Sequence, residues 1–124
     1  MDNKFPKNHK LYRLPLIGCD IYFFTDKKSF VNAEKSLGID APVNLDNSSG
    51  YTARYTNDEC VIFYMFGVFE HDYSYFVHEL FHLVVYICDA AGVQIDPNNH
   101  EISAYIMGDL MKEFKEYYDI KIFP

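Results

Sequence analysis

Two histidines four residues apart are the strongest chemical signal in this chain. Residues 78–82 read His-Glu-Leu-Phe-His. On a helix, side chains at this spacing lie one turn apart on the same face, so both imidazoles can reach one metal ion. Neutral imidazole nitrogen is a common ligand of tetrahedral zinc. The spacing therefore predicts a zinc site with His78 and His82 as ligands.

Two glutamates complete the predicted site. Glu79 lies about 100° around the helix from the first ligand, where its carboxylate can act as general base toward a metal-bound water. Glu101 would supply the third ligand from a second helix and leave the fourth position open. His100 ranks second for that role, because a neighbouring position points elsewhere on the helix. Tyr105, one turn beyond Glu101, is predicted to donate to a substrate oxyanion or to the outer side of a ligand.

Each of these residues also has a purely structural interpretation. The two histidines could be a core pair satisfied by hydrogen bonds. Glu101 could be the capping-box partner of an Asn98 N-cap, in competition with a helix that starts at Asp96-Pro97. Tyr105 could simply pack in the core between helices. We retain the metal-site interpretation as the prediction.

Composition limits the class of protein. The 124 residues are enough for one domain, 1–124, and 1–10 are expected to be a polar, poorly ordered lead-in. The formal net charge of −7 argues against nucleic acid as a partner, because a phosphate backbone attracts basic surfaces. Three cysteines without a CxxC pair are typical of reduced, buried residues in a cytosolic protein. Membrane-spanning apolar runs are absent, so we expect a cytoplasmic protein without a membrane partner.

The order of predicted elements is strands first and helices last. An α+β fold is predicted, with a small antiparallel or mixed sheet packed on an HExxH helix and a second, Glu-bearing helix. The first half of the chain is predicted to hold a strand within 11–24, strongest at 20–24, and then a helix from an N-cap at Thr25 or Asp26 to Gly38. A loop over 39–50 leads to a hairpin of strands 50–56 and 59–66, joined by Asn57-Asp58. Two helices, 73–91 and 96–118, follow.

The 73–91 helix carries the metal motif and is apolar on almost every side. Such a pattern predicts a central, buried helix, with Asp72 as N-cap and Gly92 as stop. Burying two histidines and Glu79 there would be costly unless a metal satisfied them. On the following helix, Gly108 shares a stripe with Glu101 and Tyr105. A glycine there would let that stripe lie close to the metal helix.

The motif with Glu101 downstream resembles compact gluzincin-type zincin domains. The layout is similar to the minimal zincin-like domains of ImmA/IrrE-type and SprT-type proteins. Residues 101–105, Glu-Ile-Ser-Ala-Tyr, resemble the Glu-x-x-Ala-Tyr run of small phage-encoded proteins. The resemblance covers roughly residues 50–118. It implies zinc held by His78, His82 and Glu101, with Glu79 catalytic.

The activity implied is that of a zinc metallopeptidase acting on a protein or peptide, in the host cytoplasm if the chain is phage-encoded. Zincins hold extended substrate on an edge strand just before the metal helix, for which residues 60–66 are the candidate here. ImmA/IrrE motifs usually have Gly directly before the second histidine, where this chain has Phe81. Two alternatives stay open: a catalytically silent zincin-fold interaction module, such as a phage protein that binds a host or virion protein, and a purely structural zinc.

Overall fold

The computed structural model describes residues 8–39 and 41–122. Its elements are β1 (Lys10–Leu14), β2 (Cys19–Phe24), α1 (Lys27–Ser36), β3 (Gly50–Thr56), β4 (Ile62–Val68), α2 (Tyr73–Ala91) and α3 (Glu101–Ile122). Most of the predicted lead-in, residues 1–7, lies outside the described residues. At its end, β1 begins at Lys10, and the ring of His9 lies 5.4 Å from that of Tyr22.

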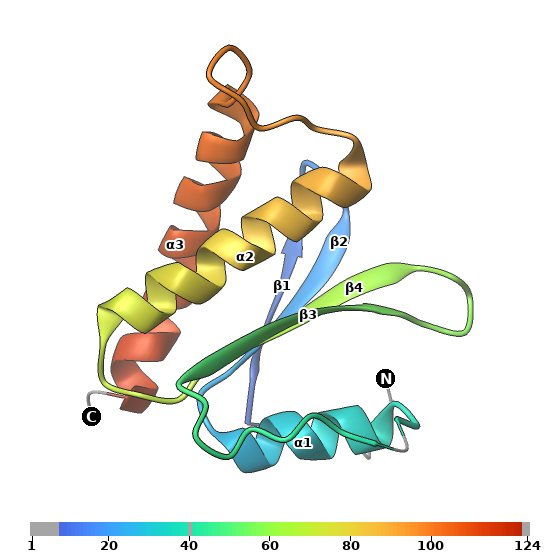
Figure 1. Cartoon of the computed structure of the whole chain (residues 1–124), viewed down its shortest axis with the longest axis vertical. Helices are drawn as coiled ribbons and strands as arrows, with labels where there is room; N and C mark the ends of the chain where they lie inside the picture. Colours follow the sequence, from blue (N-terminus) through green and yellow to red (C-terminus); the bar gives the residue numbers. More distant parts are fainter. Residues whose placement is uncertain (1–7, 40, 123–124) are drawn as a thin grey trace.

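The four strands form one mixed sheet in the order β1-β2-β4-β3 (Figure 1). The outer pairs are antiparallel, and β2 runs parallel to β4. Parallel neighbours need a crossover connection, and here α1 and β3 lie in the segment between β2 and β4. Within the described residues, four strands in a mixed sheet with three helices confirm the predicted α+β class.

Helices cover both faces of the sheet. In Figure 1, α2 and α3 lie on one face and α1 on the other. Side chains of β2 alternate between the two cores, as period-two geometry requires. Ile21 and Phe23 pack with α2 and α3, while Tyr22 and Phe24 pack with α1. The apolar strand read at residues 20–24 is therefore an interior strand buried on both faces.

Phe23 lies at the centre of the larger core, fully buried and stacked on Phe66 with ring centroids 4.4 Å apart. We expect Phe23→Ala to lower the free energy of unfolding by about 3–5 kcal/mol, because it removes a buried ring and leaves a cavity. Urea unfolding followed by circular dichroism measures the change. The matched control is Phe81→Ala, whose side chain is 57% exposed and should change stability by only about 0.5 kcal/mol. Similar losses for both variants would contradict this core assignment.

Local sequence signals were sufficient for the first helix but not for the turn of the hairpin. Of the two predicted N-cap residues, Asp26 is the N-cap of α1, and its Oδ1 accepts a hydrogen bond from the Ser29 amide at 2.8 Å. The two-residue turn predicted at Asn57-Asp58 is wrong, since β4 begins at Ile62 rather than at residue 59. Asn57 Oδ1 instead accepts from the amides of Glu59 and Val61, at 2.8 and 3.0 Å, and stabilises a longer turn.

The last helix begins later than the sequence suggests. Asp96 does not cap α3; its side chain accepts from the Asn98 amide at 2.8 Å in a separate turn. The helix runs from Glu101 to Ile122, past the predicted end near residue 118. Since Glu101 is the first helical residue, the capping-box alternative, which needs it at the third position, is not formed either.

The prediction that the cysteines are buried is right for two of the three. Cys19 and Cys88 are buried, whereas Cys60 is exposed in the hairpin turn, with a φ of 63°. All three are free thiols. Within residues 8–39 and 41–122, none of the helices combines the length and apolar character needed to cross a membrane.

Candidate functional site

The helix that carries the motif begins and ends where the sequence predicts. Asp72 is the N-cap of α2, and its Oδ1 accepts from the Ser74 amide at 2.9 Å. Gly92 ends the helix in the left-handed conformation, with φ at 72°. The hydroxyl of Tyr118, on α3, accepts a hydrogen bond from the Asp72 amide at 3.0 Å and donates one to the carbonyl oxygen of Glu70. These two hydrogen bonds connect the start of α2 to the C-terminal part of α3.

Burial of α2 is one-sided, which corrects the prediction of a helix enclosed on all sides. Its inner face packs in the core through residues such as Phe76, Leu80 and Ile87. An outer apolar strip is exposed and consists of Val77 (40%), Phe81 (57%) and Val85 (37%). The sequence shows which residues of the helix are apolar, but it does not show which of them another segment of the chain covers. We call these three residues the α2 strip.

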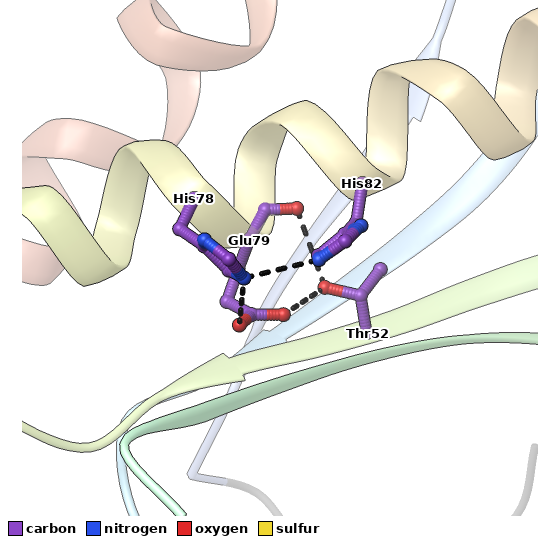
Figure 2. Close-up of polar contacts among 4 residues, drawn as sticks. All are labelled: Thr52, His78, Glu79 and His82. Carbon is purple, nitrogen blue, oxygen red and sulfur yellow. Dashed lines mark hydrogen bonds and ion pairs between the residues drawn. The ribbon is translucent and has the colours of Figure 1, made fainter.

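His78 and His82 lie next to the α2 strip with their imidazoles against each other. Their Nε2 atoms are 3.1 Å apart, and the rings meet nearly at right angles, at 81° (Figure 2). Two nitrogens on one tetrahedral zinc ion, each about 2.05 Å from the metal, lie about 3.3 Å apart. The same separation allows a nitrogen-to-nitrogen hydrogen bond when one ring is the donor. The pair therefore fits two positions of a zinc coordination sphere with little side-chain movement.

Glu79 lies between this histidine pair and the sheet. It is 7% exposed, and its Oε1 accepts a hydrogen bond from the Thr52 hydroxyl of β3 at 2.5 Å. Its Oε2 lies 4.0 Å from Nε2 of His78. Figure 2 shows the carboxylate directed toward both Thr52 and the histidines. The Glu79 carboxylate is therefore held next to the histidine pair, and its role as a general base stays a prediction.

Glu101 does not join the two histidines. Across the described residues, no group of three or more His, Cys, Asp or Glu side chains is arranged to hold a metal ion. In Figure 1, α3 begins at the top, whereas the N-terminal half of α2 lies lower, at the left of the view, beside the later part of α3. His100 and Glu101 are both exposed at the start of α3. A Cβ at Gly108 would meet no atom within 4 Å, so the close approach predicted there is not formed.

Tyr105 lies elsewhere as well. Its side chain is 71% exposed and lines a surface hollow with Leu16, at the β1–β2 turn, and Asp109. Asp109 accepts a hydrogen bond of 2.6 Å from Tyr12, and burial together with this bond raises the pKa of Tyr12 to about 12. The structure thus brings together the motif residues of α2 but not the predicted residues of α3.

The strand beside Glu79 contributes residues that sequence analysis missed. Thr52 bonds to Glu79, and a Cβ at Gly50 would lie 2.7 Å from Glu79 Cγ. Two residues past Thr52, on the same face of β3, Arg54 forms an ion pair of 3.6 Å with Asp89 of α2. The only available signal was the period-two alternation of a strand, which puts these β3 residues on one face without saying what they face.

The strand predicted to hold substrate is also corrected. Residues 60–66 fall largely in β4, which pairs with β2 on one side and β3 on the other. Its backbone groups are therefore already used within the sheet. The sheet edge next to α2 is β3, bonded to β4 alone among the strands of the described residues.

Comparisons with known proteins add no family. No family model, curated protein or solved structure matches this chain. The site itself consists of two neighbouring imidazoles and a carboxylate held beside them by Thr52.

Proposed function

We propose that this protein is a zinc-dependent hydrolase, most simply a metallopeptidase, with His78 and His82 as zinc ligands and Glu79 as general base. The observation that carries the proposal is the 3.1 Å separation of the two Nε2 atoms, with the Glu79 carboxylate held alongside. Two ligands and a base on one helical turn are the core of an HExxH hydrolytic site. The resemblance to zincin domains adds the substrate class, a protein or peptide in the cytosol.

The two carboxylate oxygens of Glu79 have separate tasks in this mechanism. A zinc ion held by His78 and His82 would supply an acidified water and polarise the scissile carbonyl. Oε1 is occupied by Thr52, so Oε2, on the His78 side, is the atom that takes the proton from the water. Glu79 then returns this proton to the leaving amine, as general acid–base catalysis requires.

Glu101 remains the proposed third ligand. Recruiting it needs the first turn of α3 to move toward the N-terminal half of α2. Both helices carry exposed apolar residues, the α2 strip and Ile102 at 43%, and burying them against each other would favour such a movement. Extended substrate would then add to β3, the edge strand beside Glu79.

Metal removal tests the proposal. Protein loaded with Zn²⁺ should hydrolyse fluorescein-labelled casein, the activity should disappear after treatment with a chelator, and added Zn²⁺ should restore it. The chelator should leave the far-ultraviolet circular dichroism unchanged, since the histidine pair lies outside the core. Hydrolysis that survives chelation, or zinc-loaded protein without hydrolysis, would contradict the proposed activity.

A second candidate function is a catalytically silent interaction module. The exposed α2 strip favours it, since apolar residues gathered at a surface commonly mark a protein-binding site. This candidate makes a different prediction for Glu79→Gln, because a binding module should keep its partner affinity when a general base is removed. A hydrolase should instead keep zinc and lose turnover.

A further inference from the structure

We infer that two residues of β3, Gly50 and Thr52, are positioning residues for the general base: Gly50 leaves the space that Glu79 occupies, and Thr52 fixes its orientation. The catalytic meaning of this arrangement rests on the proposed function, whereas the arrangement itself can be tested without metal or substrate. Both residues lie on the face of β3 that meets α2, two positions apart.

Gly50 is required for space rather than for backbone conformation, since its φ is not in the left-handed region. A Cβ there would lie 2.7 Å from Glu79 Cγ, 3.0 Å from Glu79 Oε2 and 2.9 Å from the carbonyl oxygen of Gly67. The carbonyl belongs to β4, which pairs with β3 at this point, so it is fixed by the sheet. Glu79 is the neighbour that can move, and any side chain at residue 50 would push its carboxylate away from the present position.

Thr52 controls which oxygen of Glu79 faces the histidines. Its hydroxyl is buried, with the residue 8% exposed, and lies 2.5 Å from Glu79 Oε1 and 3.3 Å from the Glu79 carbonyl oxygen. A hydroxyl has one hydrogen to donate, and the shorter contact identifies the carboxylate as its acceptor. Oε1 is thereby held against β3, and Oε2 is left toward His78.

The first experiment measures whether residue 50 and the Glu79 side chain compete for the same space. Urea unfolding midpoints are compared for the wild type, Gly50→Ala, Glu79→Ala and the double variant, without metal. We expect Gly50→Ala to lower the midpoint more in the wild type than in the Glu79→Ala background, where the clash with Cγ is gone. Equal shifts in both backgrounds would overturn the inference. The matched control is Gly108→Ala, whose Cβ meets nothing within 4 Å and whose effect should not depend on residue 79.

The second experiment tests the consequence for the reaction, with Zn²⁺ and labelled casein as probes. Gly50→Ala and Thr52→Val should lower kcat about 100-fold, because displacing a catalytic group by about 1 Å costs this much. Their Zn²⁺ affinity should stay near the wild-type value, and Thr52→Ser, which keeps the hydroxyl, should restore kcat.

The two experiments fail in different ways. Unchanged kcat in Gly50→Ala and Thr52→Val, measured against an active wild type, would overturn the positioning role. A wild type that hydrolyses nothing would instead refute the proposed function, and the unfolding comparison would still decide whether Gly50 holds the space for Glu79.

Discussion

Replacing Glu79 with Gln should lower kcat for labelled casein by about 10²–10⁴-fold, the range expected when a general base is removed. The amide has nearly the shape of the carboxylate, and its oxygen can still accept a hydrogen bond from the Thr52 hydroxyl. The fold and the Zn²⁺ affinity should therefore be retained. Hydrolysis rate, Zn²⁺ affinity and unfolding midpoint, measured on the same preparation, separate loss of the base from loss of structure.

The matched control for this substitution is Glu116→Gln, the same change at an exposed position of α3. It should leave the hydrolysis rate near the wild-type value, because this residue lies outside the site. A Glu79→Gln variant with undiminished turnover would show that the Glu79 carboxylate is not the base.

Removing either imidazole should have the largest effect on metal binding. We expect His78→Ala and His82→Ala each to weaken Zn²⁺ affinity by more than about 100-fold, since losing only an outer partner of a ligand costs about 10–100-fold. The unfolding midpoint should change little in the metal-free protein, because both histidines are exposed. Competition with a chromophoric chelator measures the affinities.

His71→Ala is the matched control for the imidazole variants, since this exposed histidine precedes α2. It should bind Zn²⁺ as tightly as the wild type.

Glu101→Gln adds a test of the third ligand: weaker binding is expected if the first turn of α3 moves to the histidines. Equal affinities for His82→Ala and the wild type would remove the basis of the metal site.

Features that depend on nearby residues could be predicted from the sequence. Asp26 and Asp72 cap their helices through bonds to amides two or three residues away, and Gly92 ends α2 with a left-handed φ. The strand around Phe23 was recognisable because residues 20–24 are rich in the aromatic and β-branched types that favour strands. The motif on α2 was found for the same reason, since its spacing alone puts both imidazoles on one face.

Features that depend on contacts between distant segments could not be predicted. The α2 strip looks like core in the sequence, but its residues lie on a side of α2 that is exposed in the structure. Asn57 looks like half of a two-residue turn, yet its side chain binds two amides and lengthens the turn. Gly50 and Thr52 carry no motif, and their role follows only from the position of β3 against α2.

The most direct test of the metal site is a Zn²⁺ titration of ¹⁵N-labelled protein followed through the ring nitrogens of its histidines. We expect the Nε2 signals of His78 and His82 to shift together and to stop shifting after about one equivalent of Zn²⁺, because both bind the same ion. Ring-nitrogen signals of these two residues that stay unchanged while Zn²⁺ is added would contradict the account.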